Sequence, residues 1–307
     1  MKNLLFLSIL ICMGCLRLVA QPGVPSLSRN HEPRSCSLLN PQSNQANHVD
    51  DFVLFNAYNL QANSIRSLHL VATVRAEDAV DNGISERAPE LPVVIDFVDP
   101  DLIRATVVAS FAGSRRFEMA SDGKEIRLLM PREGKTALFV GPVDAPLQLI
   151  GETVNISFQS FIDALHWPVG KRIAGEQPLG SSDTDARMLK VDLSPGGTGP
   201  HSAHIEFDLI RGQVNSVATY DSAGELISKA KYSEWQEVAI SPSGSSQGCL
   251  PRHIEFVIPK QNYKITLQVS EIVLNSEIPR RAKGIDAVKA TGSKNDDSSQ
   301  FSVIKTA

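Results

Sequence analysis

The sequence has few aromatic residues, no surplus of positive charge and no long hydrophobic run. Phe, Trp and Tyr make up 6% of 307 residues, so a binding surface of stacked rings is not expected. Lys and Arg number 30 against 34 Asp and Glu. Nucleic-acid binding needs basic side chains in excess on one face, and this balance argues against it. Apolar residues reach 42%, which is enough to build a core and too many for a mostly disordered chain.

The longest apolar run, residues 4–13, stands at the start of the chain and follows one cation, Lys2. At about 1.5 Å per residue it spans half of a roughly 30 Å hydrocarbon core, so it is too short to cross a membrane as a helix. It is typical of a signal peptide, here residues 1–14, which places the mature chain outside the cytoplasm. No later stretch is long and apolar enough to cross a bilayer.

Two processing sites remain open. Gly14-Cys15 resembles the bacterial lipobox, in which the cysteine becomes lipid-modified, so Cys15 is the predicted lipidation site. Residues 15–46, rich in Pro, Ser and Asn, would then form a tether between membrane and domain. The alternative is cleavage after Ala20, which would leave a soluble periplasmic protein, although Leu18 is large for such a site.

Cys36 and Cys249 remain once the leader is removed and Cys15 is acylated. An even pair in an oxidising compartment favours a disulfide. Such a bridge would close a loop of roughly 200 residues and contribute at most about 5 kcal/mol. Two unpaired thiols are the alternative, and the sequence leaves both open.

Periodicity divides the rest of the chain. Apolar residues recur at helical spacing over 49–65, and a second helix is expected over 155–165. From residue 68 to 274 short alternating segments follow one another, with Gly- and Asp-containing turns about ten residues apart. This pattern indicates a meandering antiparallel sheet of ten or eleven strands. So long a sheet curls, and the two helices are natural covers for its apolar face. Residues 280–307 are polar and are predicted to be a disordered tail.

Short motifs occur in a fixed order between residues 52 and 279. They are Asp99-Pro100-Asp101-Leu102-Ile103-Arg104, Ala120-Ser121-Asp122-Gly123-Lys124, Leu129-Met130-Pro131, Phe139-Val140-Gly141, Leu250-Pro251-Arg252-His253-Ile254 and Val273-Leu274-Asn275. This ordered set resembles the LolA/LolB-like proteins, which handle lipoproteins, and their anchored relatives. The resemblance implies a mainly β domain over residues 47–279: an unclosed antiparallel β-barrel of about eleven strands, with helices covering the concave face.

The resemblance also implies a function, because the family's apolar hollow takes up acyl chains. In anchored members a loop between strands exposes an apolar side chain to the membrane, and Phe111 is the comparable residue here. The alternative is that Phe111 only closes the end of the core. The side chains expected to surround an acyl chain are Leu68, Leu70, Val107, Leu128, Phe207 and Leu267.

Signs of catalysis are weak. No Gly-x-Ser-x-Gly elbow frames a nucleophile. His201 and His204 stand three apart on a predicted strand, so they face opposite sides and are not expected to share a metal ion. Asp96, Asp99 and Asp101 are expected to be a solvated turn. No enzymatic activity, cofactor or metal site is therefore predicted.

Two functions remain. The first is a lipid-anchored, periplasm-facing protein of the outer membrane that binds acyl chains of lipids or lipoproteins and aids their transfer or retention. The second is a scaffold or accessory lipoprotein of an envelope complex, whose hollow is filled by its own side chains.

Overall fold

The computed structural model describes residues 36, 51–78, 90–98, 102–108, 116–132, 135–143, 147–149, 152–154, 158–166, 168, 179–183, 188–193, 202–208, 210–240, 247–276 and 303–305. Cys15, Phe111 and the predicted boundaries at residues 14, 46 and 279 lie outside these ranges.

Strands dominate the described residues. The elements are α2 (Asp51–Ser64), β1 (Ser67–Asp78), β2 (Leu91–Val98), β3 (Leu102–Val108), β4 (Arg116–Ser121), β5 (Glu125–Arg132), β6 (Lys135–Pro142), β7 (Leu147–Leu149), β8 (Glu152–Val154), α3 (Phe158–His166), β9 (Leu179–Asp183), β10 (Met188–Leu193), β11 (Ser202–Asp208), β12 (Gln213–Tyr220), β13 (Leu226–Ala239), β14 (Gln247–Ile258), the 3₁₀ turn η2 (Pro259–Gln261), β15 (Tyr263–Leu274) and β16 (Val303–Lys305). No helix in these ranges is long and apolar enough to cross a membrane.

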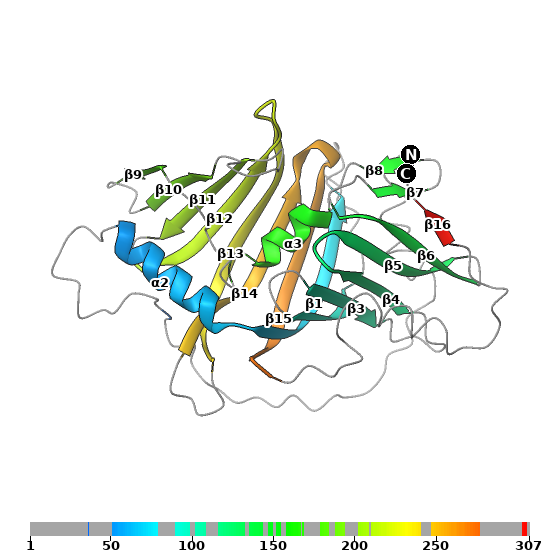
Figure 1. Ribbon diagram of the computed structural model, residues 1–307, viewed down its shortest axis with the longest axis horizontal. Helices are drawn as coiled ribbons and strands as arrows, with labels where there is room; N and C mark the ends of the chain where they lie inside the picture. Colours follow the sequence, from blue (N-terminus) through cyan, green and yellow to red (C-terminus); the bar gives the residue numbers. More distant parts are fainter. Residues whose placement is uncertain are drawn as a thin grey trace.

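Fourteen strands form one sheet in the order β16-β6-β5-β4-β3-β2-β1-β15-β14-β13-β12-β11-β10-β9, and β7 and β8 pair separately. The chain starts in the middle with β1 and builds one half through β6. It then crosses over through α3 to the far edge and returns through β10–β15 to pair with β1 (Figure 1). Among the described residues, the edge strands β16 and β9 do not pair with each other. The predicted unclosed antiparallel barrel is therefore confirmed, with more strands than the eleven expected.

Four of the observed strands were not predicted from the sequence. The hairpin β7–β8, the edge strand β9 and β16 are short, and short segments show little alternation. β16 lies within the predicted disordered tail and pairs in parallel with β6, Ile304 opposite Phe139. In the long hairpin β13–β14, Glu237 and Cys249 continue the ladder through a polar stretch.

Both helices lie on the concave face of the curved sheet (Figure 1). From α2, Leu54 and Tyr58 enter the core, and from α3, Ile162 and Leu165 do so. They join the inward-facing residues of both halves of the sheet in one continuous hydrophobic cluster. Leu60 is one of the apolar residues of the predicted helical stretch 49–65, but its side chain is 70% exposed.

Candidate functional site

The residues predicted to surround an acyl chain lie in the hydrophobic core of the concave face. Strand register places Leu70, Ile95, Ala105, Met119 and Leu128 in one row across β1–β5. Such a row lies on one face of a sheet because side chains alternate between the two faces along each strand.

The neighbouring row brings in a further predicted position. Val107 pairs in register with Val93, which pairs with Ala72. Val93 and Ala72 are buried, so the β3 backbone at position 107 lies in a row with core residues.

Protein atoms already cover these side chains. The exposed fraction is 1% for Leu68, 5% for Leu70, 1% for Leu128, 0% for Phe207 and 1% for Leu267. All five belong to the continuous core cluster. The sequence therefore identified apolar residues of one core, and in this conformation that core is closed.

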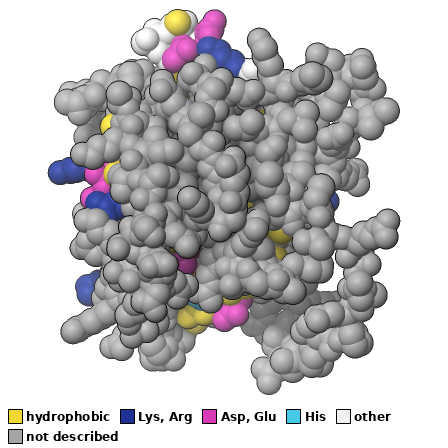
Figure 2. All heavy atoms as spheres, turned by 90° about the vertical axis from the view of Figure 1, so that its right-hand side faces the viewer, with side chains coloured by type: hydrophobic (Ala, Val, Ile, Leu, Met, Phe, Trp, Pro, Cys, Tyr) yellow, Lys and Arg dark blue, Asp and Glu magenta, His cyan; other side chains and the backbone are white. Residues whose placement is uncertain are grey.

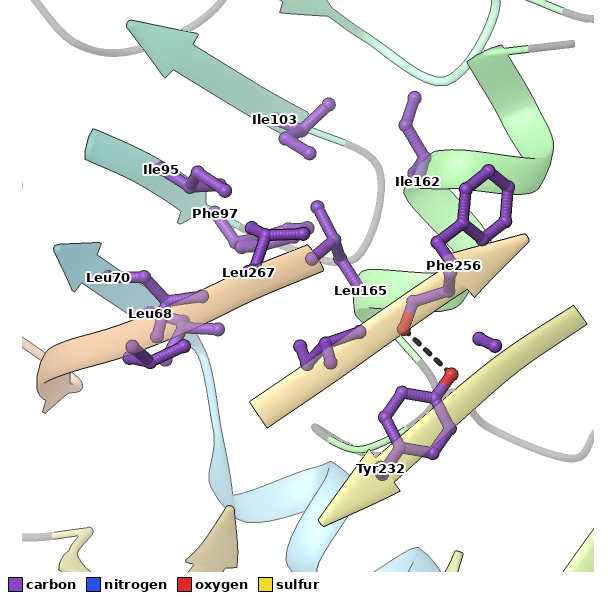
Figure 3. Packing of buried hydrophobic residues seen from close by; sticks show 14 of the residues in the cluster. Leu68, Leu70, Ile95, Phe97, Ile103, Ile162, Leu165, Tyr232, Phe256 and Leu267 are labelled. Carbon is purple, nitrogen blue, oxygen red and sulfur yellow. Dashed lines mark hydrogen bonds between the residues drawn. The ribbon is translucent and has the colours of Figure 1, made fainter. Parts of the chain in front are cut away.

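Helix α3 covers the centre of the concave face. Leu165 points toward Leu267 and Phe97 (Figure 3). Beside it, Phe161 meets Phe256 with ring centroids 5.8 Å apart. This nine-residue helix thus fills, with its own side chains, the space that the acyl-binding hypothesis assigns to a ligand.

A buried tyrosine holds α3 against the sheet. Tyr232 of β13 donates its hydroxyl hydrogen to the carbonyl oxygen of Ala164, with 2.8 Å between the oxygens (Figure 3). Burial raises the pKa of Tyr232 well above 10, and Tyr58 and Asp163 act in the same direction. The folded-state pKa thus lies above the unfolded one, so this stabilisation is complete below about pH 10 and is lost as the pH rises further.

We expect Tyr232→Phe to lower the free energy of unfolding by about 1 kcal/mol at pH 7, because the Ala164 carbonyl loses its donor. The variant should also lose less stability than the wild type between pH 9.5 and 11, since position 232 no longer carries a hydroxyl that can ionise. Urea unfolding at several pH values measures both effects. Tyr220→Phe on β12, which is only partly buried, serves as the control and should keep the alkaline sensitivity of the wild type.

Helix α2 covers the other half of the concave face. Tyr58 packs edge-on against Phe207, with ring centroids 5.5 Å apart. Asn275, from the last sequence motif, anchors the end of the helix. Its side-chain amide donates to the carbonyl oxygens of Ser64 and Ile240, and its carbonyl oxygen accepts the Arg66 N–H at 2.7 Å.

Gln61 of α2 joins three parts of the molecule. It is 6% exposed. Its Oε1 accepts the Cys249 N–H at 2.9 Å, and its Nε2 donates to the carbonyl oxygens of Cys249 and of Pro168, just beyond α3. A Cβ at Gly248 would lie 3.4 Å from Gln61 Oε1 and 3.2 Å from Ile240. The side chain therefore satisfies both backbone groups of Cys249, as a neighbouring strand would, and the close fit depends on the adjacent glycine.

Cys249 is also disulfide-bonded to Cys36, with Cα atoms 5.9 Å apart. Cys36 is 2% exposed and Cys249 is 3% exposed. Gln213, the first residue of β12, donates from Nε2 to the Cys36 carbonyl oxygen at 2.6 Å. The bridge thus fixes one point of the predicted tether against the sheet.

The opposite, convex face carries polar and charged pairs. His69 Nδ1 lies 2.6 Å from Asp96, and Lys264 Nζ lies 3.0 Å from Glu255. The hydrogen bond from Lys264 lowers the pKa of Glu255. Figure 2 views the molecule from the right-hand side of Figure 1, and the charged side chains visible there lie at the margins of the view. Within the described ranges no three His, Cys, Asp or Glu residues converge as a metal site would require. Asp96 thus has a histidine partner, and Asp99 and Asp101 lie outside the described residues.

No family model and no curated protein matches this chain. Solved structures do. A DUF1329 family protein from Desulfovibrio piger aligns with a TM-score of 0.50 and 9% identity over 77% of this chain and 96% of its own. A LolA superfamily protein from Nitrosomonas europaea aligns with a TM-score of 0.47 and 13% identity over 76% of this chain and 98% of its own. A domain from Vibrio parahaemolyticus, named for outer membrane lipoprotein sorting, aligns with a TM-score of 0.49 and 8% identity over 75% of this chain and 94% of its own. The fold of this chain is therefore shared with the DUF1329 family protein, and at 9% identity that likeness is one of fold alone.

Proposed function

We propose that this chain is a lipid-anchored bacterial envelope protein that binds acyl chains of lipids or lipoproteins in its half-barrel and aids their transfer to, or retention at, the outer membrane. The mechanism is non-enzymatic. The observation that carries the proposal is the cover of the concave face. This cover is α3, a nine-residue helix in the connection between the two halves of the sheet. Its Ile162 and Leu165 pack in the same core as the predicted acyl-binding residues.

The magnitudes favour an exchange between helix and ligand. Burying Ile162 and Leu165 is worth about 1.5–3 kcal/mol each, whereas an acyl chain that buries about ten CH₂ groups gains on the order of 8 kcal/mol before ordering costs. An acyl chain can therefore compete with α3 for the concave face. The closed core described above is then the unloaded state.

The location rests on the leader. Cys15 is proposed to carry the lipid, and Leu16 after it does not resemble a retention signal for the inner membrane. Several acyl chains make such an anchor effectively permanent. Cleavage after Ala20 would instead release the protein into the periplasm.

A second candidate is a scaffold lipoprotein whose closed core never opens. The nearly complete burial of Leu68, Phe207 and Leu267 favours it. In that case α3 is a permanent part of the core, and a partner would bind elsewhere on the domain.

Mass spectrometry of lipids extracted from the purified protein separates the two candidates. We expect a stoichiometric acyl lipid, or uptake of one after incubation with phospholipid vesicles. A protein that carries no lipid after both treatments would support the scaffold and overturn acyl binding.

A further inference from the structure

The disulfide determines where the predicted tether leaves the domain. The segment from Cys15 to Cys36 is 21 residues long (36 − 15), and its second end is held at Cys249. The Gln213 side chain holds the Cys36 carbonyl at the same place. The lipid anchor is therefore connected to one end of the sheet rather than to α2, which begins only at Asp51.

Strand register shows which end this is. Cys249 pairs with Glu237 near the end of β13, and Gln213 pairs with Asp208 at the β11–β12 turn. The same end contains the start of β1, because Leu68 pairs with Leu274 at the end of β15. We call it the Cys249 end of the sheet.

Two large hydrophobic side chains are exposed among the described residues, and both adjoin this junction. Ile210 is 47% exposed and lies three residues before Gln213, while Leu60, at 70%, directly precedes Gln61. The surrounding bonds give Ile210 a fixed place, since Asp208 Oδ1 accepts its N–H at 2.8 Å and Gly212, at a φ of 69°, donates to the Asp208 carbonyl oxygen at 2.7 Å. Arg211, which follows Ile210, and Arg66, two residues beyond the end of α2, are exposed.

We propose that the Cys249 end of the sheet faces the membrane and that Ile210 and Leu60 contact the bilayer there. This inference rests on the proposed lipid anchor at Cys15. The random-coil average for any chain of 21 residues is about 25 Å, close to the roughly 26 Å length of β12, so a lipid on Cys15 would favour the end of the sheet at which Cys36 is fixed. The tether holds the two side chains near the bilayer at an effective concentration on the order of millimolar, which makes a weak contact sufficient. The neighbouring arginines suit anionic headgroups.

The segment proposed from the family resemblance as the membrane contact connects β3 to β4, and these two strands pair at the other end of the sheet through Val108 and Arg116. Val98 pairs with Ser67 at the Cys249 end, so β3 begins there and ends at the opposite end with Val108. Phe111 itself lies outside the described residues, but the strands on either side of its loop stand at that opposite end. One orientation cannot bring both ends to the same bilayer.

Fluorescence quenching tests the orientation. The lipidated protein is reconstituted in phosphatidylethanolamine–phosphatidylglycerol vesicles that contain a spin-labelled lipid, and a single added cysteine, Ile210→Cys, carries an environment-sensitive dye. Ala223→Cys is the matched control. It is exposed in the turn after β12, at the opposite end, and Asp221 accepts its N–H much as Asp208 does for Ile210. We expect the dye at position 210 to be quenched at least threefold more strongly than the dye at 223.

When Cys36 and Cys249 are both replaced by serine, the difference in quenching between positions 210 and 223 should become smaller, because the tether is then no longer fixed at the Cys249 end of the sheet. Equal quenching at 210 and 223 in the disulfide-bonded protein, or stronger quenching of a dye at Phe111→Cys, would overturn the orientation while leaving acyl binding untouched. Failure of the vesicles to retain the protein would overturn the Cys15 anchor, and the orientation with it.

Discussion

Replacing Cys36 and Cys249 together by serine is expected to lower the free energy of unfolding by about 2–5 kcal/mol. The bridge joins residues 213 apart in sequence. Closing so long a loop removes conformational entropy worth up to about 5 kcal/mol from the unfolded chain. The folded state should also lose order around positions 36 and 249. Gln61 and Gln213 bind the backbone of these two residues, and without the bridge the two backbone segments are no longer joined.

Urea unfolding of the oxidised wild type and of the double variant measures this loss. Asn63→Ala, an exposed change on α2, is the control and should stay within about 0.5 kcal/mol of the wild type. A double variant as stable as the wild type would show that the bridge does not stabilise the domain. A free-thiol assay on denatured, unreduced wild type should detect neither cysteine.

The second large effect is expected at α3. Shortening Ile162 or Leu165 to alanine should cost about 2–5 kcal/mol, because each leaves a cavity in the core. If acyl chains compete with α3, the same change must also raise the affinity for an acyl chain. Each 1.4 kcal/mol by which the closed state is destabilised corresponds to a tenfold gain in that affinity. We therefore expect Leu165→Ala to bind a fluorescent fatty acid at least about tenfold more tightly than the wild type.

Ile126→Ala is the matched control for this experiment. Ile126 lies on β5 in the same core and is 4% exposed, so its truncation costs stability while leaving α3 intact. It should not raise the affinity for the fatty acid. If Leu165→Ala and Ile126→Ala both lose stability and neither gains affinity, α3 is a permanent part of the core and the scaffold function is the better account.

The sequence predicted the sheet well because alternation is a local signal. Leu68 and Leu70 alternate with His69 and Val71, and the structure buries the first two beneath the helices. The apolar positions named for acyl binding followed from the same alternation. Alternation marks a core face, however, and cannot show whether that face is covered by the chain itself or by a ligand.

The polar connections could not be read from the sequence. Gln61 stands in a helical stretch with ordinary neighbours, and its partners Cys249 and Pro168 are 188 and 107 residues away. The exposure of Leu60 depends on how α2 lies on the sheet, which helical spacing does not determine. For the cysteines, sequence could state both alternatives, but only the fold brings Cys36 within reach of Cys249.

The most direct test of acyl binding is photo-crosslinking with a fatty acid that carries a diazirine near the end of its chain, followed by mapping of the modified peptides. The proposed function predicts adducts on the concave face, in peptides of α3, β14 and β15 that contain Leu165, Phe256 and Leu267, and it predicts that unlabelled fatty acid displaces them. Adducts confined to the convex face, or none above the level seen with unfolded protein, would contradict it.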